Sequence, residues 1–239
     1  MQYNGHAACT GSMVEMTGTA DKSAIRDAAS ILLVRGEGAA AQVLMGQRGA
    51  AAAFMPDKFV FPGGAVDVAD AEVTLARPIA AQCAARLARH HVAPNALAAA
   101  AIRELAEETG LLLGVPGDWA FVPPHWTAFA RRGLVPDASG LRYIFRAITP
   151  PGRPRRFDAR FFLAKAEAVR GDLDDFSQAC DELSHLQWVP LNEARRLNLP
   201  FITEVVLAEA QAYLEGEEMA ESVPFFDNST DISTFRRIA

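Results

Sequence analysis

Three glutamates lie close together in the segment AIRELAEETGLL, residues 101–112. On an α-helix, residues three and four positions apart share one face, so Glu104, Glu107 and Glu108 would project side by side. Like charges at this spacing destabilise a helix by only about 0.2–0.5 kcal/mol per pair, so an exposed acidic face is one explanation. The other explanation is a site for a hard divalent cation such as Mg²⁺, which prefers carboxylate oxygens and is often shared with substrate phosphates.

A double glycine ends the apolar segment FVFPGG, residues 59–64. Gly63 and Gly64 have no Cβ, which permits unusual backbone angles and a close approach of the backbone to a ligand. A glycine pair alone is a weak signal. Together with the glutamate helix, it favours a cation site next to a glycine turn.

The elements that must position these motifs alternate between strand and helix signals. Apolar segments bounded by turn residues predict strands over 28–35, 42–48, 59–64, 160–164 and 185–191, the first two as a hairpin. Apolar residues at helical spacing predict helices over 79–91, 96–109 and 201–216, and a short helix capped by Asn192. Gly110 stands where a left-handed C-terminal cap belongs. The class is therefore mixed α/β.

Composition limits the function classes. The chain has 239 residues, 50% of them hydrophobic, which is enough for one domain with a sizeable core. Its net charge of −6 argues against nucleic-acid binding, which needs a basic surface. No apolar run is long enough for a membrane span, and no secretory signal is visible. Three scattered cysteines without a CxxC pair indicate a reducing compartment, so we expect a cytoplasmic protein.

We expect three regions along the chain. Residues 1–24, rich in Gly, Ser, Thr and Ala, are predicted to be a disordered tail, and 25–218 to form the domain. Residues 219–239 are predicted to be a C-terminal tail. The sequence leaves the oligomeric state open, a homodimer included.

The glutamate segment also carries a family resemblance. RELAEETGL, residues 103–111, matches the second half of the Nudix box, REUxEExGU, at every specified position. GGAVDVAD resembles the first half, G-x5-E, with Gly64 as its glycine and Asp70 replacing the glutamate. The resemblance implies a Nudix α/β/α sandwich with a central mixed β-sheet. It also implies hydrolysis of a diphosphate linked to another moiety, with Mg²⁺ or Mn²⁺ as cofactor.

The two halves of the box are separated by an insertion. Between Asp70 and Arg103 lie 32 residues, 25 more than the family pattern has. Because closure entropy grows only logarithmically with loop length, such an enlargement is thermodynamically tolerable. We expect a helical insertion over about 71–95 that adds a substrate wall or a partner surface.

Two segments flanking the box resemble one branch of the superfamily. AFMPDKFVFPGG before the box and TPPGRPRRFDARFFLA after it are similar to segments of the insertion-bearing branch that includes the mammalian peroxisomal coenzyme A diphosphatase. The likeness extends from about Ala28 to Leu197. It implies a nucleotide-diphosphate substrate, coenzyme A or acyl-coenzyme A, cleaved to phosphopantetheine and adenosine 3′,5′-bisphosphate. The chain end RRIA does not resemble a peroxisomal S-K-L signal.

The resemblance assigns roles to the residues of the box. It implies metal binding by Glu107 and Glu108, with the carbonyl of Gly63 alongside. Glu104 would be a metal ligand or the general base, and Arg103 would orient the glutamates by ion pairing.

A further acid from a later loop often completes such sites. Glu182, six residues before Trp188, is the favoured candidate as metal ligand or base, with Asp181 as a near competitor.

Arginines provide candidate substrate contacts, because a planar guanidinium binds two phosphate oxygens at once. The candidates are Arg48, Arg155, Arg156 and Arg160. For Arg160, an ion pair with Asp158 within the strand is the alternative.

Three functions remain in competition. The first is a diphosphatase acting on coenzyme A or its acyl esters. The second keeps the enzyme class but changes the substrate to ADP-ribose, NADH or a dinucleoside polyphosphate. The third is a catalytically silent Nudix module for ligand sensing or protein binding. The complete glutamate motif argues against the third, because silent members need not retain all three glutamates.

Overall fold

The computed structural model describes residues 24–216 and 222–239, so the predicted N-terminal tail lies outside the described residues except for Ala24. One large sheet and one small sheet organise the chain. The large sheet contains β1 (Ile25–Arg35), β2 (Gln42–Arg48), β3 (Phe59–Val60), β4 (Gly63–Ala65), β7 (Arg142–Ile148), β8 (Arg156–Lys165), β10 (Leu183–Pro190), β11 (Val223–Asp227) and β12 (Thr234–Ile238). The small sheet contains β5 (Leu112–Pro116), β6 (Leu134–Pro136) and β9 (Val169–Arg170).

The large sheet is mixed, as predicted. Its order is β10-β2-β1-β8-β7-β11-β12, with β3 paired to β2 and β4 paired to β1. Strands β1 and β8 run parallel, as do β7 and β11, whereas the other pairs are antiparallel. The predicted hairpin is the antiparallel β1–β2 pair.

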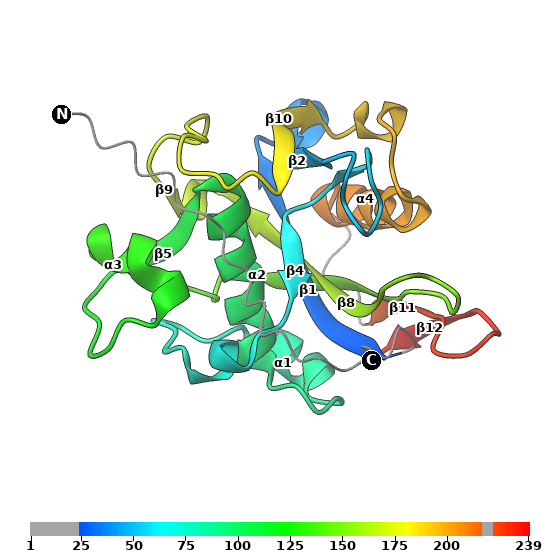
Figure 1. Cartoon of the computed structure of the whole chain (residues 1–239), viewed down its shortest axis with the longest axis horizontal. Coiled ribbons are helices and arrows are strands. Elements are labelled where there is room, and N and C mark those ends of the chain that lie inside the picture. The colour runs from blue at the N-terminus through cyan, green and yellow to red at the C-terminus, as the bar shows by residue number, and fades with distance from the viewer. Residues whose placement is uncertain (1–23, 217–221) are drawn as a thin grey trace.

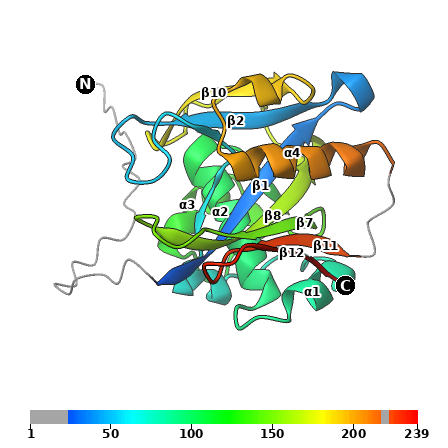
Figure 2. The ribbon, with the colours of Figure 1, turned by 90° about the vertical axis from the view of Figure 1, so that its right-hand side faces the viewer.

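Helices cover both faces of this sheet, which confirms the predicted α/β/α arrangement (Figures 1 and 2). The glutamate helix α2 lies against one face with α1, and α4 lies against the other. The helices are α1 (Ala81–Leu87), α2 (Pro94–Thr109), α3 (Thr127–Arg131) and α4 (Phe201–Leu214).

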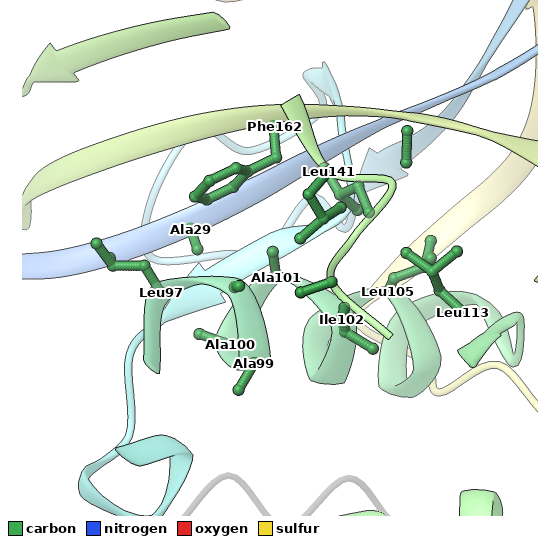
Figure 3. Close-up of a cluster of buried hydrophobic side chains, with 14 of the residues drawn as sticks. Ala29, Leu97, Ala99, Ala100, Ala101, Ile102, Leu105, Leu113, Leu141 and Phe162 are labelled. Atoms are coloured by element: carbon green, nitrogen blue, oxygen red, sulfur yellow. The ribbon is translucent and has the colours of Figure 1, made fainter. Parts of the chain in front are cut away.

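Strand β1 builds a core on each of its faces. Ile31 and Leu33 point toward the cluster around α2, and Leu32 and Val34 point toward the cluster around α4, because side chains alternate along a strand. On α2, residues 98–101 are all alanine and fully buried, so this turn is covered on every side, with Ala101 toward Ala29 and Phe162 of the sheet (Figure 3). This packing fixes the position of the glutamates one turn further along α2.

The prediction of a C-terminal tail is wrong for residues 222–239, the part of it that the structure describes. Strands β11 and β12 extend the large sheet, since Phe225 and Phe226 of β11 pair in parallel with Arg146 and Ala147 of β7. Phe225 is 7% exposed, so burial of this aromatic side chain stabilises the added strands.

Two smaller predictions also needed correction. The helix predicted over 79–91 forms only over Ala81–Leu87, so the insertion is less helical than expected. The turn near Asn192 is a short 3₁₀ segment, Ala194–Arg196, with Glu193 at its N-cap and no side-chain cap. The helix over 96–109 was predicted to within two residues, and Gly110 caps it with a φ of 77°.

Within the described residues, no helix is long and apolar enough to cross a bilayer. Cys83 and Cys180 are both buried and form no disulfide with each other.

Candidate active site

The glycine turn lies directly against the glutamate helix. Gly63 and Gly64 of β4 pair with Ser30 and Ala29 of β1. A Cβ at position 63 would lie 2.6 Å from the backbone oxygen of Ala29, and a Cβ at position 64 would lie 2.6 Å from the carboxylate of Glu104. The two glycines therefore allow the strand to approach both the sheet and the helix.

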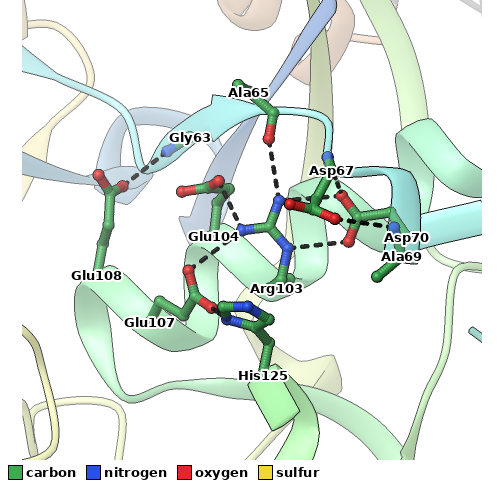
Figure 4. Close-up of polar contacts among 10 residues, drawn as sticks. All are labelled: Gly63, Ala65, Asp67, Ala69, Asp70, Arg103, Glu104, Glu107, Glu108 and His125. Atoms are coloured by element: carbon green, nitrogen blue, oxygen red, sulfur yellow. Dashed lines mark hydrogen bonds and ion pairs between the residues drawn. The ribbon is translucent and has the colours of Figure 1, made fainter. Parts of the chain in front are cut away.

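Arg103 connects the two halves of the box (Figure 4). Its guanidinium donates to both carboxylate oxygens of Asp70, at 2.9 and 3.0 Å, and to the carbonyl of Ala65 at 3.0 Å. It also donates to Glu104 at 2.7 Å and to Glu107 at 3.1 Å. Because all these groups are buried or half-buried, Arg103 holds two glutamates in place while Asp70 holds Arg103.

Asp70 reaches Arg103 although it is shorter than the glutamate of the family pattern. It sits in a 3₁₀ turn, Val68–Glu72, where it also accepts from the backbone N–H of Asp67 at 2.8 Å. This second bond fixes the carboxylate and satisfies a backbone donor at the start of the turn.

Two of the glutamates are buried without enough positive charge around them. Glu108 is 1% exposed and accepts a hydrogen bond of 2.7 Å from the Gly63 N–H. Burial and the nearby charge of Glu104 raise the pKa of Glu108 well above its usual range. Burial raises the pKa of Glu104 to about 7, although the charge of Arg103 opposes this shift. A bound cation would favour the ionised form of both groups.

Sequence reasoning missed His125. It lies in the 3₁₀ turn Pro124–Trp126, and its Nδ1 is 2.8 Å from a carboxylate oxygen of Glu107. The adjacent Trp126 is 1% exposed and packs on Phe129 at 5.1 Å, which holds this turn against α2. The sequence carries no periodic signal here that could have placed His125 beside the box.

The structure brings Glu182 to the same site. The backbone N–H of Cys180 donates to the carbonyl of Glu107, which draws this loop onto the C-terminal end of α2. Glu182 pairs with Arg48 at 3.0 Å, and its charge acts on both Glu104 and Glu108. Asp181, the competing acid, is exposed, as Glu182 is, so exposure does not distinguish the two.

Arg156 and Arg160 lie elsewhere, in buried contacts of β8. Arg156 donates to the carbonyls of Thr149 and Asn228, at 3.1 and 2.8 Å. Arg160 is 1% exposed and bonds to Asp27 and to the carbonyl of Asp158. Because both arginines are buried and bond to protein acceptors, we do not propose them as phosphate contacts. Arg155 is exposed.

The chemistry of the donor set fits a hard divalent cation. Glu104 and Glu108 lie against the glycine turn, Glu107 is on the same helix, and the charge of Glu182 acts on Glu104 and Glu108. Mg²⁺ and Mn²⁺ prefer such carboxylate oxygens. Among the described residues, no three acidic, His or Cys side chains are yet gathered around one point, because Arg103 and His125 hold Glu104 and Glu107. Metal binding therefore requires these carboxylates to turn from their present partners.

Comparison with known proteins shows the family of the chain. The model of the NUDIX domain matches residues 24–209. The chain belongs to the Nudix family. It is 30% identical over 185 residues to "Putative nudix hydrolase 7" of Caenorhabditis elegans, a match that covers 72% of this chain and 53% of that protein's length. The chain thus spans about half of that relative.

A solved structure shows the same Nudix fold. The crystal structure of a NUDIX hydrolase from Alicyclobacillus acidocaldarius superposes with a TM-score of 0.62 and 31% identity, and the match covers 83% of this chain and 96% of that one. The chain therefore has the Nudix fold and belongs to the Nudix family.

Replacing Gly64 by alanine tests the fit between the two halves of the Nudix box. The new Cβ would lie 2.6 Å from the Glu104 carboxylate, which is the end of a flexible side chain and can move. We expect turnover to fall at least about tenfold, since positioning errors of this size reduce rates strongly. The melting temperature should change by only a few degrees.

Gly140→Ala is the matched control, because a Cβ there meets no atom within 4 Å. Wild-type turnover in Gly64→Ala, measured on the same substrate, would contradict the assigned role of Glu104. Gly63→Ala should instead unfold at a lower temperature, because its Cβ would meet the backbone of β1.

Proposed function

We propose that this Nudix hydrolase is a divalent-metal-dependent diphosphatase that cleaves a nucleoside diphosphate linked to another moiety. The observation that carries the proposal is the buried pair of Glu104 and Glu108 beside the glycine turn. Burying two carboxylates is unfavourable unless they are paired, and a cation with an anionic ligand would compensate both charges.

The residues of the chain supply positioning and proton transfer. When bound, Mg²⁺ or Mn²⁺ would neutralise diphosphate oxygens and lower the pKa of water. Glu107 and Glu108 would hold the cation, and Arg103 would keep the side chains of the glutamates in position. Glu104, buried, or Glu182, half-exposed, would accept the proton of the attacking water. Arg48, which already pairs with Glu182, remains a candidate phosphate contact.

Coenzyme A or acyl-coenzyme A is the first candidate substrate. Its support is the sequence likeness of the two segments that flank the box. The later segment forms β8, where Arg156 and Arg160 make buried structural contacts. That part of the likeness therefore reflects the sheet, and the support for coenzyme A comes from the segment before the box and from the insertion.

A substrate panel with products identified by mass tests both the enzyme class and the choice of coenzyme A as substrate. The panel contains coenzyme A, an acyl-coenzyme A, ADP-ribose, NADH and a dinucleoside polyphosphate, each with Mg²⁺ and with Mn²⁺. We expect the highest kcat/KM for coenzyme A or its acyl ester, with release of phosphopantetheine and adenosine 3′,5′-bisphosphate. A clear preference for another compound of the panel would show that coenzyme A is not the substrate, while the chain would still be a diphosphatase. No metal-dependent cleavage of any member would favour a silent binding module.

A further inference from the structure

A second polar pocket lies away from the glutamates. It has a volume of about 420 Å³ and is formed by three separate parts of the chain. Arg89 and His90 come from the box insertion, Arg146 and Ile148 come from β7, and the remaining wall comes from β11 and β12. In both views, β11, β12 and α1 lie at the opposite end of the molecule from β2 and β10, the strands beside Glu182 (Figures 1 and 2).

Most of the pocket lining comes from the box insertion and from the strands that follow the matched residues. Strands β11 and β12 follow the matched residues 24–209, and Arg89 and His90 belong to the insertion between the two halves of the box. The pocket therefore depends on the insertion and on the C-terminal strands of this chain.

Positive charge is concentrated in this pocket. Four arginines line it, although the whole chain has a net charge of −6. Arg236 pairs with Asp227, and Arg146 pairs with Asp158. Within residues 24–216 and 222–239, Arg89 and Arg237 form no ion pair, and Arg237 donates only to the hydroxyl of Ser222, at 3.2 Å. Two cationic side chains thus remain for a ligand.

The floor of the pocket is rigid and partly apolar. Arg146 is 4% exposed, donates to Asp158 at 2.7 Å and lies 4.2 Å from the ring centroid of Phe225. Arg236 lies over the same ring at 5.3 Å. Burial and the charge of Arg146 lower the pKa of His90, so its neutral ring accepts a hydrogen bond from Arg146. These contacts fix the guanidinium of Arg146, and the buried side chains of Ile148 and Ile238 form the apolar part of the lining.

We propose that this pocket binds the phosphate group of a small phosphomonoester, at a site separate from the glutamates of α2. Guanidinium groups bind phosphate oxygens in pairs, and the charge of a phosphomonoester matches the two arginines that lack an ion pair. The volume suits a small molecule. The proposal does not rest on the hydrolytic activity.

Calorimetric titration in excess EDTA tests the proposal, because chelation removes any cation-dependent binding at the glutamates. The probes are AMP, inorganic phosphate and adenosine, at constant ionic strength. We expect AMP and phosphate to bind saturably to the wild type and adenosine not to bind. The double variant Arg89→Ala/Arg237→Ala should bind AMP at least about tenfold more weakly, because it removes two guanidinium groups that would bond to the phosphate oxygens.

The double variant Arg195→Ala/Arg196→Ala is the matched control, because both arginines are exposed and their loss makes the same change in net charge at residues that do not line the pocket. It should bind AMP within about twofold of the wild type. Unchanged affinity in Arg89→Ala/Arg237→Ala, adenosine binding as tightly as AMP, or no binding of either anion to the wild type would each overturn the proposal. Arg89 and Arg237 are also exposed, and an unchanged melting temperature confirms that the variant is folded.

Discussion

Replacing Glu108 with glutamine should reduce kcat/KM for the best substrate of the panel by at least about 10³-fold. Glutamine keeps the size of the side chain, and its carbonyl oxygen can still accept the hydrogen bond from the Gly63 N–H. It removes the negative charge that would hold the cation. Because stabilisation of transition-state charge by a metal is of the order of 4 kcal/mol, its loss corresponds to about three powers of ten in rate.

The control for this substitution is Glu204→Gln, an exposed carboxylate on α4, across the sheet from the site. It makes the same chemical change without touching the glutamate helix and should keep wild-type activity. If Glu108→Gln retained more than a tenth of the wild-type kcat/KM, Glu108 would not be a metal ligand. The double variant Glu107→Gln/Glu108→Gln should show no turnover, with a folded protein by circular dichroism.

The glutamate helix is the part that the sequence predicted best. Its apolar spacing and its terminal glycine are local signals, and they place the helix over 96–109 where the structure has Pro94–Thr109. Local rules work here because Ile102 and Leu105 face the core while the glutamates face β4, a division that the sequence itself displays. The resemblance of the box then assigned roles to the same residues.

Residues that meet only through the tertiary fold were harder to predict. Asp70 and Arg103 are 33 positions apart, with the insertion between them, so their contact depends on how that loop closes. His125 reaches Glu107 from a segment without a periodic pattern. Neither spacing nor composition contains the information that places these side chains together.

Residue type alone was misleading for the arginines of β8. A guanidinium suits a phosphate, a carboxylate and a backbone carbonyl equally well. Arg160 sits opposite Ala29 in the parallel β1–β8 pair, which directs it toward Asp27 and Asp158. Only the strand register distinguishes this structural role from a ligand contact.

The C-terminal strands were missed for a related reason. Strand β11 pairs with β7, whose residues lie about 80 positions earlier in the chain, so no turn signal connects the partners. Strand β12 is mostly exposed and rich in arginine, and it lacks the alternating pattern of a half-buried strand. Arg236 and Arg237, which made this strand hard to predict, also contribute to the positive charge of the polar pocket.

The same Glu108→Gln substitution should stabilise the metal-free protein. A carboxyl group whose pKa is higher in the folded than in the unfolded state stabilises the fold below the unfolded value, and that contribution is lost as pH rises through the folded value. For Glu104, this contribution is lost between pH 4.5 and about pH 7. For Glu108, the loss begins at pH 4.5 and continues to a higher pH, because its pKa in the folded state is raised well above 4.5. In EDTA, wild-type stability should therefore fall between about pH 5 and pH 8.

We expect metal-free Glu108→Gln to melt several degrees above the wild type at pH 8, because about 1 kcal/mol moves Tm by about 2–4 °C in a chain of this size. The difference should shrink toward pH 5, where the buried carboxyl of the wild type is protonated. Adding Mn²⁺ at pH 8 should reverse the order, since a ligand that binds only the folded wild type raises its Tm. Equal melting temperatures at pH 8 in EDTA would show that the carboxylate of Glu108 is already compensated within the protein, and the electrostatic argument for a cation would fail.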